Sequence, residues 1–161
     1  MLLKFVKKRI QRHRIIRNNT KTIELLENIQ DEKIPKFSLK GKEFFAKCVK
    51  VYDGDTCHLI FYYNSKLSRF VCRMEGYNSA ELRTNDEDER IKAIEAKNKL
   101  SDFILNKVVL IKCGDFDMYG RLLTTIYLLD ENKIPWLASI NMLMVEQGYG
   151  KEYNGRGEKN Y

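Results

Sequence analysis

The sequence lacks a hydrophobic run of membrane-spanning length. Charged residues at positions 4, 7, 8 and 9 also interrupt the apolar core that a signal peptide would need near the amino terminus. We therefore expect an intracellular protein. Cys-x-x-Cys spacing is missing as well, so the sequence gives no support for a zinc or redox motif. The four cysteines lie in apolar segments and are expected to be small buried thiols in a reducing compartment: Cys48, Cys57, Cys72 and Cys113.

Acidic residues are absent from the first 21 positions, which contain eight basic ones. The chain has 29 Lys and Arg against 22 Asp and Glu, so without those eight, residues 22–161 carry 21 basic and 22 acidic side chains. The basicity therefore belongs to an amino-terminal arm. Such an arm favours contact with nucleic acid or another anionic surface, although a solvated helix face explains the charges equally well. Membrane contact through residues 1–16, as an interfacial helix, is a minority interpretation.

A chain of 161 residues, 43% of them hydrophobic, can bury one sizeable core. We expect a basic, helical arm over residues 1–40 and one folded domain over residues 41–161. Within the arm, residues 1–30 are expected to be helical, with a possible break or N-cap at Asn18-Asn19-Thr20, and Pro35 ends the region. No internal repeat or low-complexity linker is present.

The domain begins with short strand-like segments. Alternating and β-prone residues predict strands at 43–52, 56–63, 67–74, 107–113 and 121–129. An acidic stretch at 84–89 precedes apolar residues at helical spacing, which predicts a helix to about residue 106, and Ser139 is expected to cap a short last helix that Gly148 closes. The tail 149–161 is expected to be loosely ordered. The predicted fold class is α+β, mainly β: a five-stranded OB-fold barrel with a helix after strand 3, a short carboxyl-terminal helix and the basic helical arm.

Asp53 and Asp55 flank Gly54 in the turn between the first two predicted strands. A tight turn could aim both carboxylates at one spot, where their repulsion favours a bound cation. The simpler alternative is a hairpin turn, since Asp-Gly is a common turn pair.

Two arginines and a glutamate complete the candidate site. Arg73 ends the third predicted strand, a short loop before Glu81, and Arg121 begins the fifth strand. Guanidinium groups bind phosphate oxygens through two parallel hydrogen bonds, as a phosphoryl-transfer site requires. A salt bridge from Arg73 to Glu75 or Glu81 would explain that residue equally well.

These motifs occur in the order of the staphylococcal (thermonuclease-like) nuclease family. The segment 51–56 (Val-Tyr-Asp-Gly-Asp-Thr), Arg73 followed by Ser-Ala-Glu at 79–81, and Tyr-Gly-Arg at 119–121 resemble that family's motifs, and the resemblance covers roughly residues 43–155. It implies an OB-fold, calcium-dependent phosphodiesterase that acts on DNA and RNA with little sugar specificity.

The resemblance also implies a role for each matched residue. Asp55 would be a direct metal ligand, and Asp53 would support the water shell of the metal. Glu81 would be the general base or orient the attacking water, while Arg73 and Arg121 would neutralise charge on the transition state. The expected substrate-binding tyrosines are Tyr119, Tyr149 and Tyr153, although packing on the barrel is an equal alternative for the last two.

The expected metal site departs from the family pattern at Asn78, which stands where the family has a second metal-binding aspartate. Asn78 offers a carbonyl oxygen without charge, and Ser79 offers a hydroxyl and a backbone carbonyl where the family has threonine. Calcium affinity follows the charge of the ligands, so Ca²⁺ should bind more weakly, and another divalent cation is possible. The following proline is replaced by Ala80, which should loosen the loop that positions Glu81.

The leading hypothesis is thus a metal-dependent nuclease that binds DNA, RNA or both, with no obligate protein partner. One alternative is a catalytically weak or inactive OB-fold module that binds nucleic acid. Another is an arm-anchored membrane or scaffold protein with a vestigial barrel. The complete set of Arg73, Glu81 and Arg121 favours the enzyme, because a module that only binds has no chemical need for all three at this spacing.

Overall fold

The computed structural model describes residues 2–30 and 33–153. The chain divides into two compact units, Met1–Phe37 and Ser38–Tyr161. The first unit contains one helix, α1 (Leu2–Glu27), of 26 residues. The expected break at Asn18-Asn19-Thr20 is wrong, because α1 continues through it. The Asn19 side-chain amide donates to the carbonyl of Ile15 at 2.8 Å, so it bonds to the helix's own backbone and does not cap a new helix.

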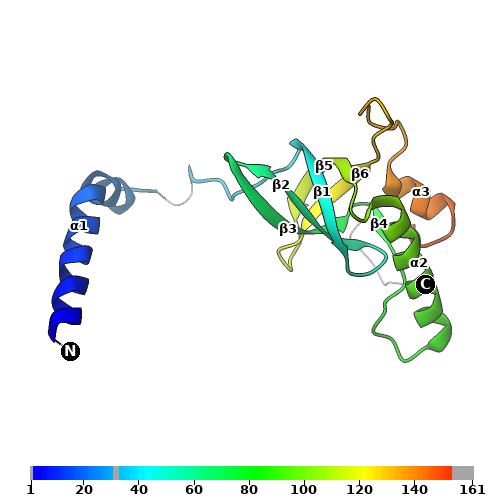
Figure 1. The fold of residues 1–161 in the computed structure, drawn as a ribbon, viewed down its shortest axis with the longest axis horizontal. Helices are drawn as coiled ribbons and strands as arrows, with labels where there is room; N and C mark the ends of the chain where they lie inside the picture. Colours follow the sequence, from blue (N-terminus) through cyan, green and yellow to red (C-terminus); the bar gives the residue numbers. More distant parts are fainter. Residues whose placement is uncertain (1, 31–32, 154–161) are drawn as a thin grey trace. The chain divides into compact units, whose positions relative to one another are not determined.

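The second unit contains a closed barrel of five strands (Figure 1). The strand order is β1-β2-β3-β6-β5; β3 and β6 pair in parallel, and the other pairs are antiparallel. This closed barrel with helices confirms the predicted mainly β, OB-type class. The barrel strands are β1 (Glu43–Val51), β2 (Thr56–Tyr63), β3 (Lys66–Met74), β5 (Val108–Phe116) and β6 (Leu122–Tyr127).

Side-chain alternation fills the barrel with apolar residues, and register shifts interrupt it in β1 and in β5. The pairing of β1 with β2 shifts register between Cys48 and Lys50. Cys48 and Val51 are both buried, whereas Lys50 is exposed. A bulge of this kind lets one strand change which side chains face inward. The regular alternation expected along this strand is therefore wrong beyond Cys48.

Two helices close the second unit. The helix α2 (Glu87–Ile104) is capped by Asp86, whose carboxylate accepts from the backbone amides of Asp88 and Glu89, and three acidic residues in its first turn meet the positive end of the helix dipole. Its buried face has the predicted spacing of Ala93, Ala96, Leu100 and Ile104. The helix α3 (Ile140–Glu146) has the predicted Ser139 cap, and Gly148 follows it with a φ of 78°. In the part of the chain that the structure describes, no helix has the length and apolar character to cross a membrane.

A small sheet of two short strands was not predicted. The strand β4 (Tyr77–Asn78) pairs antiparallel with β7 (Lys151–Glu152), so that Asn78 lies opposite Lys151. The expected looseness of the tail is therefore wrong at residues 151–152, and residues 154–161 lie outside the described part. Gly150 is required beside this sheet, because a Cβ there would lie 2.3 Å from the carbonyl oxygen of Asn78. The segment after α3 thus holds the strand that leads to Glu81.

Candidate active site

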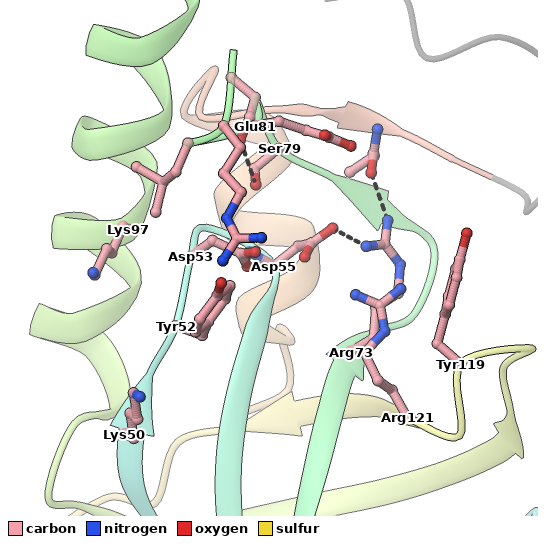
Figure 2. Close-up of a pocket in the computed structure, with 14 residues that line it drawn as sticks. Lys50, Tyr52, Asp53, Asp55, Arg73, Ser79, Glu81, Lys97, Tyr119 and Arg121 are labelled. Atoms are coloured by element: carbon pink, nitrogen blue, oxygen red, sulfur yellow. Dashed lines mark hydrogen bonds and ion pairs between the residues drawn. The ribbon is translucent and has the colours of Figure 1, made fainter.

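A cavity of about 750 Å³ opens where the β1–β2 loop, the end of β3, the loop after β4 and the turn before β6 meet beside α2 (Figure 2). Its walls contain most of the residues that the sequence selected. The lining residues are Lys50, Tyr52, Asp53, Asp55, Arg73, Asn78, Ser79, Ala80, Glu81, Leu82, Arg83, Lys97, Tyr119 and Arg121.

The β1–β2 loop presents Asp55 inward. The backbone amide of Asp55 donates to Asp53 Oδ1 at 3.2 Å, and its carbonyl accepts from the amide of Met74 at 2.8 Å, which ties the loop to β3. Gly54 lies so close to α2 that an added Cβ would come within 2.7 Å of the Cβ of Ala96. The glycine therefore lets the loop pack on the helix while Asp55, only 4% exposed, faces the cavity.

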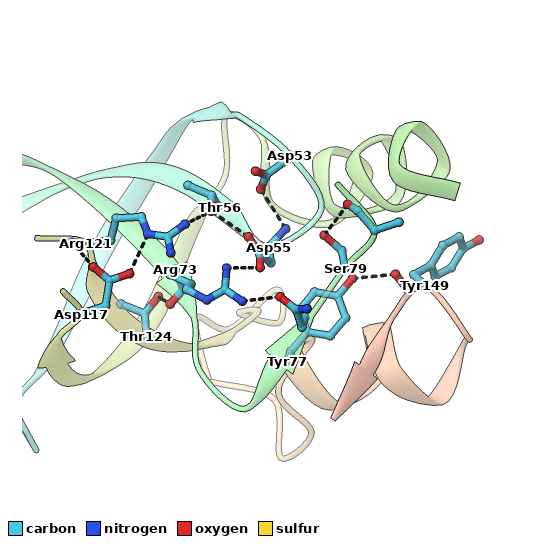
Figure 3. Close-up of polar contacts among 12 residues, drawn as sticks. Asp53, Asp55, Thr56, Arg73, Tyr77, Ser79, Asp117, Arg121, Thr124 and Tyr149 are labelled. Atoms are coloured by element: carbon cyan, nitrogen blue, oxygen red, sulfur yellow. Dashed lines mark hydrogen bonds and ion pairs between the residues drawn. The ribbon is translucent and has the colours of Figure 1, made fainter. Parts of the chain in front are cut away.

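Asp55 and Arg73 form a buried ion pair (Figure 3). Residue Thr56 is paired with Arg73 across β2 and β3, and this register brings the guanidinium beside the Asp55 carboxylate. A second Arg73 nitrogen, Nη2, donates to Asn78 Oδ1 at 2.5 Å. Burial raises the pKa of the Asp55 carboxyl to about 6, although the Arg73 charge opposes that shift. The guanidinium is thus held between one carboxylate and one neutral amide.

Arg121 is fixed by the turn before β6. Its Nε donates to Asp117 Oδ2 at 2.7 Å, while Asp117 Oδ1 accepts from the backbone amides of Tyr119 and Arg121 at 2.9 and 2.8 Å. Burial acts against ionisation of Asp117, but these donors from Arg121 and Tyr119 outweigh it and lower the pKa of the carboxyl. Asp117 therefore acts as a charged brace for the Arg121 side chain.

Thr56 joins the two arginine groups into one network, which Figure 3 shows. Its hydroxyl donates to Asp55 Oδ1 at 2.7 Å and accepts from Arg121 Nη1 at 3.2 Å. A continuous chain of polar contacts therefore runs from Asp117 through Arg121, Thr56 and Asp55 to Arg73. Rigid placement of two cations around one cavity is the arrangement that charge stabilisation of a phosphate requires.

The strand β4 and the loop that follows it carry Asn78, Ser79 and Glu81. Asn78 and Ser79 are buried, and Glu81 is exposed where it lines the same cavity (Figure 2). The backbone amide of Glu81 donates to Glu89 Oε1 at 3.4 Å, which links the loop to the first turn of α2. A carboxylate at the rim of a cavity keeps contact with solvent, as a group that activates water needs.

A model of the family described as staphylococcal nuclease homologue matches residues 73–161, more than half of the chain. The chain belongs to this family. No curated protein matches the chain. The matched region includes Arg73, Glu81 and Arg121, while Asp53 and Asp55 precede it. Membership in the staphylococcal nuclease homologue family indicates a nuclease-type or nucleic-acid-binding module.

The site of this nuclease homologue brings together eight of the ten predicted residues. Tyr119 is one of the eight; it is 75% exposed, and its ring lies 5.4 Å from Arg121 Cζ. Tyr149 and Tyr153 are not among the cavity-lining residues. Tyr149 packs against the core, and its carbonyl accepts from the Tyr77 hydroxyl at 2.9 Å. Tyr153 lines a neighbouring cavity of about 520 Å³, with its ring 6.0 Å from Arg73 Cζ.

Sequence reasoning gave no role to several residues of the nuclease homologue's site. Thr56 ends the motif at 51–56, and Asp117 stands two residues before the motif at 119–121. The Asp-x-x-Gly pattern at 117–120 is a turn signal that could have identified Asp117. Lys50 and Tyr52 line the cavity from the end of β1, with the Lys50 Nζ 5.7 Å from the Tyr52 ring centroid. Lys97 reaches the cavity from α2. Tyr52 lies inside the motif at 51–56, whereas Lys50 and Lys97 carried no signal in the sequence.

The oxygen ligands in the cavity are of the type that a hard divalent cation prefers, but few of them are charged. Asp53 and Asp55 contribute carboxylates, and Asn78 and Ser79 contribute neutral oxygens. Over residues 2–30 and 33–153, no three His, Cys, Asp or Glu side chains form a group that could hold a metal ion. In addition, Asp55 and Asn78 both accept hydrogen bonds from Arg73. A cation at these ligands would compete with the guanidinium, which predicts weak binding.

Proposed function

We propose that this protein is a metal-dependent phosphodiesterase that hydrolyses DNA and RNA with little sugar specificity. The single observation that carries the proposal is the network of Arg73, Asp55, Thr56 and Arg121 beside Glu81 in one cavity. Family membership supports the same class of activity. A binding surface alone would need positive charge, but it would not need two braced guanidinium groups facing a carboxylate.

The two arginines would bind the scissile phosphate and neutralise the charge that grows on it in the transition state. Arg121 is held at Nε by Asp117 and at Nη1 by Thr56, so it enters the reaction already oriented. A guanidinium has five N–H donors, which leaves donors of Arg121 for a phosphate oxygen. Loss of one such preorganised donor lowers the rate by about 10²- to 10³-fold.

Glu81 would take the proton of the attacking water or orient that water. It is exposed at the cavity rim, opposite the buried Asp55, so the two carboxylates have different surroundings. A carboxylate that contacts solvent can bind a water molecule and accept its proton. The contact between its backbone amide and Glu89 would keep the loop in place during the reaction.

Asp53, Asp55, Asn78 and Ser79 would hold the cation, for which Ca²⁺ is the first choice and another divalent ion the second. When bound, the cation would polarise the phosphoryl group and offset its charge. The contacts with Asp55 and Asn78 orient the Arg73 guanidinium at the cavity. A phosphate oxygen that binds Arg73 must compete with these two acceptors.

A nuclease assay on single-stranded DNA and RNA tests the proposal. The full chain is incubated with calcium, magnesium, manganese or chelator and compared with Glu81→Gln and Arg121→Ala. We expect ion-dependent cleavage that each substitution lowers by about 10²-fold or more. Glu131→Gln, which removes an exposed carboxylate from a turn that does not line the cavity, is the matched control and should cleave like the wild type. A wild type as inert as both variants under every ion would refute the enzyme.

One observation favours a second candidate, a nucleic-acid-binding module without catalysis. Asn78 adds no charge to the expected metal site, and Arg73 occupies two of its oxygen donors. Such a module would bind oligonucleotides with equal affinity in calcium and in chelator and would release them uncut. The same assay, read by binding as well as by cleavage, separates the two functions.

A further inference from the structure

Acidic residues are absent from most of the sheet that leads away from the cavity. Between positions 44–52 and 56–74, which span most of β1 and all of β2 and β3, the sequence has no Asp or Glu. Residues 22–161 as a whole carry nearly equal numbers of acids and bases, so this sheet concentrates positive charge that the rest of the chain balances. Its basic residues are Lys47, Lys50, Lys66, Arg69 and Arg73.

Strand pairing places several of these cations on one outer face. Lys47 lies opposite Ile60, and Ile60 lies opposite Arg69, so that the two cations flank one residue of β2. Lys50 lies opposite His58, two residues along the same strand. Positions two apart on a strand share a face, so Lys47, Lys50 and Arg69 point the same way.

The bulge in β1 is what makes this arrangement possible. Lys47 and Lys50 are three positions apart, and in a regular strand they would point to opposite faces. The register shift between Cys48 and Lys50 places both on the outer face. Burial lowers the pKa of His58, and the positive charges of Lys50 and Arg69 lower it further, which puts both cations near the His58 ring.

Aromatic side chains stand on the same face at the end farthest from the cavity. Tyr62 follows Ile60 by two positions and is 66% exposed, and Phe45 precedes Lys47 by two positions and is 60% exposed. Exposed rings beside cations are the elements from which proteins build surfaces for unpaired bases, because each ring stacks on a base while each cation neutralises a phosphate. Lys50 belongs to this face and also lines the cavity, so the face and the cavity are continuous.

We propose that this outer face binds single-stranded nucleic acid as an extension of the strand whose phosphate enters the cavity. The face is defined by Phe45, Lys47, Lys50, Tyr62 and Arg69. From the pair Thr56–Arg73 to the pair Tyr62–Leu67 it spans six residues, about 20 Å, which leaves room for several nucleotides. The inference rests on the proposed function, since the cavity must accept a phosphodiester for a strand to continue from it.

The test compares a short and a long ligand on the full chain. Binding of a labelled dinucleotide and of a labelled twelve-residue oligothymidine is measured by fluorescence anisotropy in chelator over a range of salt. Lys47→Gln and Arg69→Gln should each lower the affinity for the long oligonucleotide about fivefold near 0.1 M salt. Each should also reduce the slope of log affinity against log salt concentration by about 0.7. In the double variant the two fivefold losses of affinity should multiply, and the two decreases in salt slope should add. The dinucleotide, which reaches only the cavity, should bind each variant like the wild type.

Two further variants separate this face from general charge. Lys92→Gln removes an exposed cation from α2 and should leave binding unchanged. Tyr62→Ser should lower the affinity for the long oligonucleotide without altering the salt dependence of that affinity, because stacking of a base on a ring releases no counterion. Wild-type affinity of the Lys47 and Arg69 variants for the long ligand would overturn the inference, as would an equal loss in Lys92→Gln. Self-association that Tyr62→Ser abolishes, with nucleic-acid binding intact, would also overturn it. Failure of the wild type itself to bind or cut any oligonucleotide would instead refute the proposed function.

Discussion

Restoring the missing acid with Asn78→Asp should strengthen metal binding, and the structure allows its size to be worked out. Two unit charges about 4 Å apart interact by about 4 kcal/mol at an effective dielectric constant of 20, and a divalent ion doubles that value. Most of the gain is offset, because the new carboxylate would already pair with Arg73, whose Nη2 lies 2.5 Å from Asn78 Oδ1, and because the position is buried. We expect a net gain of about 1.4–2.8 kcal/mol, or a tenfold to hundredfold lower calcium requirement.

The assay is a calcium titration of cleavage, together with the melting temperature of the protein at each calcium concentration. Ligand that binds the folded state raises the melting temperature, so the variant should respond at lower calcium than the wild type. Asn98→Asp, on the exposed side of α2, makes the same chemical change away from the cavity and should have no effect. An unchanged calcium requirement in Asn78→Asp would refute the placement of this residue at the cation.

Three further changes probe the brace, the loop packing and the arm. Asp117→Asn should lower the free energy of unfolding by about 1–2 kcal/mol at pH 7, because the ionised carboxylate holds Arg121. Since the pKa of Asp117 lies below its ordinary value of 3.8, this difference should shrink as the pH falls through that range; a difference that urea unfolding finds equal at pH 7 and pH 3 would contradict the ionic role. Gly54→Ala should cost about 1–3 kcal/mol in urea unfolding through its clash with Ala96, and wild-type stability would show that the loop can move aside. Deletion of residues 1–21 should reduce the salt dependence of nucleic-acid binding while leaving the cleavage rate at saturating substrate unchanged; an unaltered salt slope would remove the arm from substrate binding.

The barrel and its helices could be predicted because their signals are periodic. Alternation marked the barrel strands, and the spacing of Ala93, Ala96 and Leu100 marked the buried side of α2. The bulge in β1 left only a faint signal, the two successive apolar residues Cys48 and Val49 between Lys47 and Lys50, and it is the pairing with β2 that shows the shift. The pairing of β4 with β7 could not be predicted for another reason: a strand of two residues is too short to show side-chain alternation.

The composition of the site was easier to predict than its contacts. The resemblance, which rested on the order of the motifs, placed Asp55, Arg73 and Arg121 in one site, and all three line one cavity. The ion partner of Arg73 depends on the register of β2 against β3, and this register could not be predicted from the sequence. The ion pair of Arg73 with Asp55 was therefore not predicted. For Tyr149 the sequence left contact with the substrate and packing on the barrel as equal alternatives, and in the structure the residue packs against the core while its backbone carbonyl accepts from the Tyr77 hydroxyl.

The pairing of Asn78 with Lys151 also sets an order of events during translation. The chain emerges from the ribosome amino end first, so all five barrel strands and α3 are complete before Lys151 is added. Until then β4 lacks its partner strand β7, although the hydrogen bonds from Arg73 to Asn78 and from Glu81 to Glu89 can already form at the two ends of the loop. The cavity is therefore one of the last parts of the domain to be completed, after the barrel that supports it.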